Sequence, residues 1–172
     1  MDGIAVTQMH RRDLRAVLDI EKRVFPEPWS SSVFASELAL RHVRSYRIAR
    51  LGRKTIGYRG LMLGEEAHVT TLAVAPEHQR KGVATLLLLD AVSTAIESGA
   101  ISVSLEVAFS NGGAQALYRR FGFSPVGVRK RYYQLTGEDA YVMFVREVDR
   151  PEYRQRIAAI EEELRRRPAV VI

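Results

Sequence analysis

The amino-acid sequence predicts an α/β fold, in which one mixed, mostly antiparallel sheet is flanked by helices. Two observations support this. Three strand-like segments follow one another with only short turns between them, which is typical of antiparallel neighbours. Strand-like and helix-like segments then alternate, which is typical of crossover connections within the same sheet. With 172 residues, the chain is long enough for one domain with a real core but short for two.

The first half of the chain predicts two helices followed by three strands. Apolar residues at helical spacing favour a helix over residues 7–24. The segment FPEPWS, residues 25–30, would end it because of its two prolines, and Ser30 or Ser31 can cap the next helix. The three strand-like segments are residues 45–50, 55–63 and 67–76.

The second half predicts alternating helices and strands. A long apolar helix is expected over residues 81–98, where Gly99 stops it, and another over residues 111–123. Further strands are expected at residues 101–109, 124–135 and 140–148.

Residues 151–172 predict an amphipathic, charged helix that packs on, or extends, a single domain formed by residues 1–150. One face is apolar, through Tyr153, Ile157, Ile160 and Leu164. Ion pairs four residues apart would support this helix: Glu161–Arg165, Glu162–Arg166 and Glu163–Arg167.

Composition excludes several classes of function. The chain has no cysteine, so disulfides, thiolate catalysis and cysteine-based metal sites are excluded, and we expect no metal. We find neither an apolar leader nor a segment of the roughly 20 apolar residues that span a bilayer. We therefore expect a cytoplasmic protein with no membrane partner. The net charge of +6 favours an anionic ligand. No Cys/His finger occurs, and the basic tail is balanced by glutamate, so we expect no direct nucleic-acid partner.

The segment HQRKGVAT, residues 78–85, lies between a strand-like and a helix-like segment. The start of a helix exposes unpaired N–H groups and carries positive potential, so it suits phosphate oxygens. Gly82 would let a ligand approach the backbone, and Arg80 and Lys81 would add charge. Taken alone, such a turn is more often only a turn, and it matches neither the Walker pattern nor the dinucleotide-binding pattern.

The longer segment LAVAPEHQRKGVATLLL resembles the signature of the GNAT superfamily of N-acetyltransferases, with Ala84 where glycine is more usual. Three further segments narrow the resemblance to the RimI-like N-terminal acetyltransferases, over residues 4–148. They are FPEPWS, SLEVAFSNGGAQALYRRFGF, and RKRYY with EDAYVM, in that order. The resemblance implies the GNAT fold, with a β-bulge and splayed strands at the cofactor site.

The resemblance also implies acetyl-CoA as the cofactor. The amides of the turn would hold the pyrophosphate, the preceding strand would pair with the pantetheine arm, and Asn111 would cap a helix and contact the cofactor. The cofactor-binding residues expected in this way are Leu72, Ala73, Val74, Arg80, Lys81, Gly82, Val83, Ala84, Thr85 and Asn111.

Two residues are expected to carry the chemistry. Glu106 alternates with apolar residues along its strand, and by pattern alone it could equally be a solvent-facing glutamate. The resemblance implies that it is the general base, and a partly apolar strand would raise its pKa. Tyr118 lies on an apolar stripe and reads as a core aromatic residue. The resemblance implies that its hydroxyl also protonates the departing CoA sulfur.

The acceptor is expected to be the N-terminal α-amine of a protein, typically a ribosomal one. A stiff, aromatic slot suits an extended peptide, although ordinary packing would explain the same residues. The substrate-binding residues expected are Phe25, Pro28, Trp29, Arg131, Tyr132 and Tyr133. Other acceptors remain open: a lysine side chain, a polyamine or another small amine. So do two further classes, a basic RNA- or ribosome-binding module and a CoA-binding sensor without catalysis.

Overall fold

The computed structural model describes residues 3–166, and these form a seven-stranded sheet in the order β1-β2-β3-β4-β5-β7-β6. Only β4 and β5 are parallel neighbours, and the other neighbouring pairs are antiparallel. The strands are β1 (Ile4–Gln8), β2 (Arg44–Leu51), β3 (Lys54–Met62), β4 (Glu66–Val74), β5 (Ser102–Ala108), β6 (Ser124–Tyr133) and β7 (Glu138–Arg146). The predicted mixed, mostly antiparallel sheet is confirmed.

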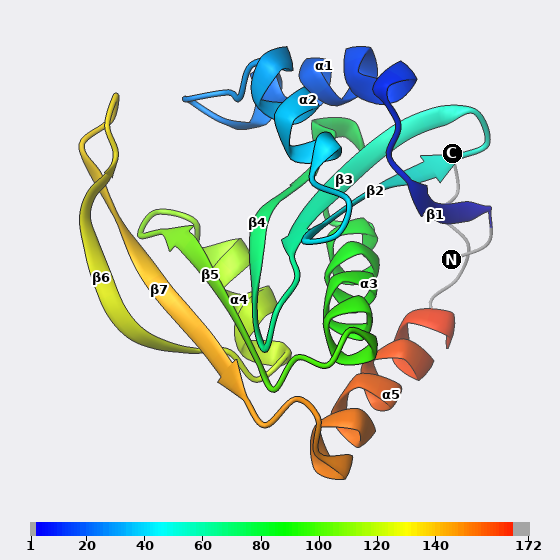
Figure 1. Cartoon of the computed structure of the whole chain (residues 1–172), viewed down its shortest axis with the longest axis vertical. Coiled ribbons are helices and arrows are strands. Elements are labelled where there is room, and N and C mark those ends of the chain that lie inside the picture. The colour runs from blue at the N-terminus through cyan, green and yellow to red at the C-terminus, as the bar shows by residue number, and fades with distance from the viewer. Residues whose placement is uncertain (1–2, 167–172) are drawn as a thin grey trace.

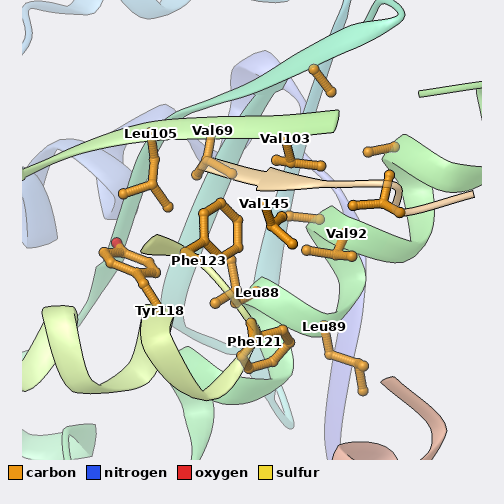
Figure 2. Close-up of a cluster of buried hydrophobic side chains, with 14 of the residues drawn as sticks. Val69, Leu88, Leu89, Val92, Val103, Leu105, Tyr118, Phe121, Phe123 and Val145 are labelled. Atoms are coloured by element: carbon orange, nitrogen blue, oxygen red, sulfur yellow. The ribbon is translucent and has the colours of Figure 1, made fainter. Parts of the chain in front are cut away.

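Helices cover both faces of the sheet (Figure 1). They are α1 (Leu14–Val24), α2 (Ser31–Ala39), α3 (Val83–Glu97), α4 (Gly112–Arg120) and α5 (Pro151–Arg166). Apolar side chains of α1 and α2 form one buried cluster with β2, β3 and β4. Those of α3, α4 and α5 form another with the opposite face, shown in Figure 2, which includes Val103 and Leu105 of β5 and Leu88 and Val92 of α3. No helix within residues 3–166 has the length and apolarity needed to cross a bilayer.

The N-terminal segment differs from the expectation. The predicted helix over residues 7–24 was wrong at its start, because residues 4–8 form β1 and α1 begins at Leu14. β1 pairs with the free edge of β2, and the Met9 N–H donates to the Tyr46 carbonyl at 2.9 Å. Hydrogen bonds to β2 therefore determine that this segment is a strand, since its local apolar periodicity is too weak to make it a helix. At the next helix, Ser30 is the cap, and its Oγ accepts from the Val33 N–H.

The parallel pairing of β4 with β5 is short, and this creates the opening for a site. The paired residues run only from Glu66 to Val69 on β4 and from Ser102 to Leu105 on β5. At the same level β4 shifts register against β3, beside Gly60. A Cβ on Gly60 would collide with the Tyr46 ring of β2 and would lie 2.5 Å from the Thr70 Oγ1 of β4, so the side chains of both neighbouring strands leave room only for glycine there. The predicted bulge and splayed strands are thus confirmed.

The α5 helix packs on the domain through its predicted apolar face, since Tyr153, Ile157, Ile160 and Leu164 are all buried. The Tyr153 hydroxyl donates to the Phe121 carbonyl at 2.9 Å, which ties α5 to the end of α4. The Glu161–Arg165 and Glu162–Arg166 pairs form, at 2.5 and 3.0 Å. The third predicted pair, Glu163–Arg167, involves a residue outside the described ones, and Glu163 pairs with Arg120 at 2.6 Å.

A buried ion pair joins the sheet to α3. The Arg59 side chain on β3 is fully buried and donates through Nε to the Asp90 carboxylate at 2.8 Å. It also donates to the Ser45 carbonyl at 2.7 Å and to the Thr94 hydroxyl at 3.0 Å. Arg47 binds the second Asp90 oxygen at 2.9 Å. The guanidinium of Arg59 is therefore fully compensated, as a buried charge must be.

Candidate active site

A cleft of about 610 Å³ lies where β4 and β5 separate. One end is formed by the turn before α3 and the start of α4, and the other by the loop after α1 and by Tyr132 and Tyr133 of β6. The volume lies within the usual range for small-molecule sites. Glu106 and Tyr118 both line the cleft between these two ends, so the structure brings the two predicted catalytic side chains together.

The turn before α3 has the geometry of an anion site. Gly82 has a φ of +84° and Arg80, although it is not glycine, a φ of +61°. The first hydrogen bond between main-chain groups here runs from the Leu86 N–H to the Gly82 carbonyl, so the amides of Val83, Ala84 and Thr85 precede the helical ladder. Such amides and the helix dipole fit a diphosphate.

The charged residues of the turn take different positions. Arg80 lines the cleft, and its guanidinium reaches across to Gly113 of α4, where it lies 3.7 Å from the position that a Cβ would occupy. Lys81 is exposed and is not among the residues lining the cleft. The Val83 side chain is buried in a core cluster with Ile56 and Leu87, which leaves only its main-chain amide for a ligand.

The strand before the turn presents a free edge to the cleft. Leu72, Ala73 and Val74 line it, beyond the point where pairing with β5 ends. Their other edge is paired with β3, and the Val74 carbonyl accepts from the Gln79 side chain at 3.1 Å, so the remaining N–H and C=O groups on the cleft side are available to an extended ligand. This arrangement fits a pantetheine arm lying along β4. Asn111 also lines the cleft, and its Oδ1 caps α4 by accepting from the Ala114 N–H at 3.0 Å.

Glu106 is the first residue of β5 past the parallel pairing, and its side chain is 10% exposed. One carboxylate oxygen lies 2.9 Å from the His68 Nε2, and the other lies 3.0 Å from the Arg129 Nη1. Burial raises the pKa of Glu106, but the hydrogen bond from His68 and the charges of His68 and Arg129 outweigh it and lower the pKa below its usual value.

The expected rise of the Glu106 pKa was therefore wrong. The expectation considered only burial within the strand, whereas the two side chains that lower the pKa of Glu106 come from β4 and β6. Sequence reasoning missed both residues as parts of the site. Strand alternation places His68 on a definite face of its strand, but only the register of β4 against β5 brings it beside Glu106.

Tyr118 is both a core residue and a cleft residue. It is 7% exposed, and its ring lies 6.0 Å from that of Phe123 (Figure 2). Burial raises the pKa of Tyr118, so the hydroxyl keeps its proton throughout the neutral range. The prediction of a core aromatic residue is confirmed. The Tyr118 side chain also borders the cleft, into which its hydroxyl is predicted to donate a proton.

The end of the cleft beside the loop after α1 is aromatic. Phe25, Trp29, Tyr132 and Tyr133 line it, whereas Pro28 and Arg131 are exposed and are not among the lining residues. The main chain of Arg131 has a φ of +50°, and its N–H donates to the Asp139 carboxylate at 2.8 Å. The hairpin also touches the opposite lip, since the Leu135 N–H donates to Glu27. Four of the six predicted acceptor residues thus share one wall.

A second carboxyl group lies at this end, and sequence analysis did not single it out. Glu21 of α1 is 2% exposed and lines the cleft. One oxygen accepts from the Trp29 N–H at 2.9 Å, which holds the loop after α1, and the other is buried with no hydrogen-bond partner among residues 3–166. Burial raises the pKa of Glu21 to about 7.

Replacing Glu21 by glutamine should stabilise the protein, and increasingly so as the pH rises. The carboxyl group binds its proton more tightly in the folded state, so its contribution to stability is lost as the pH rises from about 4.5 through about 7. Glu21→Gln keeps an acceptor for the Trp29 N–H and removes this loss, for a gain of about 2–3 kcal/mol at pH 8 and little at pH 4.5. Urea unfolding at both pH values measures the difference. Exposed Glu97→Gln is the control, and a gain that is equal at both pH values would contradict the expectation.

Comparison with known proteins shows which family the chain resembles. Residues 14–123 match the model of the "Acetyltransferase (GNAT) family". The N-alpha-acetyltransferase RimI of Mycobacterium tuberculosis is 37% identical over 83% of this chain and 92% of its own length. The ribosomal protein bS18-alanine N-acetyltransferase of Escherichia coli is 31% identical over 80% of this chain and 94% of its own length. A crystal structure of that ribosomal-protein-S18-alanine N-acetyltransferase superposes with a TM-score of 0.76, 30% identity and coverage of 84% and 94%.

Proposed function

Because the chain belongs to the GNAT family of acetyltransferases, among its RimI-like N-acetyltransferases, we propose that it acetylates the N-terminal α-amine of a ribosomal protein. The observation that carries this proposal is the shape of the cleft, which runs from an anion-binding turn, past Glu106 and Tyr118, to an aromatic mouth. The names of the two relatives support the class of acceptor, and each match spans most of both chains. A ribosomal-protein acceptor places the reaction in the cytoplasm.

Acetyl-CoA supplies the acetyl group as a thioester. The turn before α3 holds the diphosphate, and the free edge of β4 aligns the arm, so that the reacting ends meet between Glu106 and Tyr118. Glu106 takes a proton from the acceptor amine, directly or through water. The amine nitrogen then forms the new N–C bond, and a main-chain N–H of β4 would stabilise the developing negative oxygen. As the C–S bond breaks, Tyr118 would donate its proton to the sulfur, and the second proton that the nitrogen loses would return to Tyr118 through water. No covalent enzyme intermediate is needed.

An acceptor panel tests the class of substrate. We expect acetylation of a peptide with a free N-terminal alanine, and none of the same peptide with a blocked N-terminus and an internal lysine, or of spermidine. The narrow aromatic mouth favours an extended chain end held by main-chain hydrogen bonds. Mass spectrometry locates the acetyl group. Transfer to the lysine or to spermidine at a rate equal to or above that of the free terminus would overturn the proposed acceptor.

The anion site makes a separate prediction about affinity. Arg80→Ala should weaken CoA binding about tenfold, because its guanidinium lines the cleft and can pair with phosphate oxygens. Lys81→Ala should weaken binding less than about threefold, because Lys81, although adjacent, is not among the residues that line the cleft. Titration calorimetry with CoA measures both. Unchanged CoA affinity in Arg80→Ala would place the anion site elsewhere, and RNA retention by the parent protein without CoA affinity would favour a nucleic-acid-binding module.

A further inference from the structure

A line of side chains leads from the buried core to Glu106. Ser104 and Glu106 are two residues apart on β5, so they share a face, and His68 of β4 is paired in register with Ser104. The Ser104 Oγ lies 2.9 Å from the His68 Nδ1, and the His68 Nε2 lies 2.9 Å from the Glu106 carboxylate. Ser104 is 4% exposed, so this line begins in the core.

The chemistry of these groups sets the direction of the hydrogen bonds. An ionised carboxylate can only accept, so the His68 Nε2 must carry a hydrogen towards Glu106. In a neutral imidazole the Nδ1 then accepts, and the Ser104 hydroxyl is the donor within reach. Glu106 therefore selects the tautomer of His68, and the Ser104 hydroxyl can donate to its Nδ1 at 2.9 Å in place of the more distant Ala67 carbonyl at 3.4 Å.

The two oxygens of Glu106 are held by different kinds of partner. His68 is on a central strand and its side chain is 24% exposed, whereas the Arg129 side chain on the edge strand β6 is 58% exposed. Arg129 also lies over the ring of Tyr132, 5.5 Å from its centroid, and Tyr132 lines the acceptor end of the cleft. The Arg129 pair is therefore screened by solvent and can be exchanged, while the His68 pair is fixed.

We propose that His68 is a positioning residue for Glu106, which anchors one carboxylate oxygen so that the other can exchange Arg129 for the acceptor amine. This inference rests on the proposed role of Glu106 as the base. The incoming ammonium replaces the guanidinium at the outer oxygen, so the carboxylate remains paired on both sides until it takes the proton. Neither His68 nor Ser104 is required to touch the substrate.

Replacing His68 should lower kcat and leave binding almost unchanged. His68→Ala should lose about tenfold to a hundredfold in kcat, because a hydrogen bond that orients the base is lost. His68→Gln, whose amide can donate to the same oxygen, should recover most of it. The acceptor KM and the CoA affinity should stay within about threefold of the parent, which also reports that both variants fold. Parental kcat in both variants, or equal losses in both, would overturn the proposal.

The pH profile gives a second readout. The titratable and charged groups that face Glu106 are His68 from β4 and Arg129, Tyr132 and Tyr133 from β6. Tyr118 of α4 and the carboxyl groups of Glu21 and Glu27 line the same cleft. Removing the His68 hydrogen bond raises the pKa of Glu106, so the acidic limb of kcat/KM should move to higher pH in His68→Ala. An unchanged limb would contradict the pairing.

The pairing can also be tested without any substrate. Nitrogen-15 NMR of the imidazole rings should show His68 with its hydrogen on Nε2, and Glu106→Gln should shift the His68 ring resonances, because it changes the partner of that nitrogen. The other three histidines, His10, His42 and His78, should be unaffected and serve as internal controls. Identical His68 resonances in parent and variant would overturn the pairing. Shifted resonances together with full activity of Glu106→Gln would instead overturn the proposed role of Glu106, and the role of His68 with it.

Discussion

Glu106→Gln should lower kcat by about 10²–10⁴-fold and leave the affinity for CoA unchanged. Glutamine keeps the size of the side chain and can still bind His68, but it cannot take a proton from the amine. The pKa of Glu106 is also lowered, so its carboxylate is ionised throughout the neutral range. It becomes protonated, and stops acting as a base, only as the pH falls below about 4.5. Steady-state kinetics and calorimetry on the same preparation separate the two effects.

The matched control is Glu66→Gln, which changes an exposed glutamate at the start of β4, the neighbouring strand. It should keep parental kcat. Tyr118→Phe should also keep its affinity for CoA and lose kcat, because the departing sulfur no longer has a proton donor. Unchanged rates in Glu106→Gln and Tyr118→Phe would remove both residues from the chemistry and leave the cleft as a binding site.

Asp90→Ala should destabilise the protein by about 3–5 kcal/mol, the largest effect that we expect on stability. The variant leaves the Arg59 guanidinium buried at 0% exposure without its carboxylate, and Arg47 loses its partner as well. Burial already lowers the pKa of Arg59, a sign that the site disfavours an uncompensated charge. Urea unfolding measures the loss.

Two comparisons make the Asp90 result specific. Asp90→Asn keeps a hydrogen-bond acceptor for Arg59 and should lose less stability than Asp90→Ala. Glu161→Ala, which breaks the exposed pair with Arg165 on α5, should cost less than about 1 kcal/mol. A loss below about 1 kcal/mol in Asp90→Ala would mean that water reaches Arg59 and replaces the carboxylate.

Several features of the fold were predictable because they depend on local chemistry. Proline and serine at residues 25–30 end one helix and cap the next, and Ser30 does so in the structure. The four apolar residues of α5 lie on one face at helical spacing, and all are buried. A glycine before an apolar helix suits a left-handed turn, and Gly82 has that conformation.

The sequence by itself determined which residues alternate, where helices begin and end, and which segments resemble the GNAT pattern. Each of these depends on neighbours along the chain. Only the tertiary structure decided the contacts between strands, namely the formation of β1 instead of a helical start, the register of β4 against β5, and the partners of Glu106. The pKa of Glu106 is lowered and not raised for this reason. His68 and Arg129 are 38 and 23 residues away in the sequence, and they meet Glu106 only through strand register.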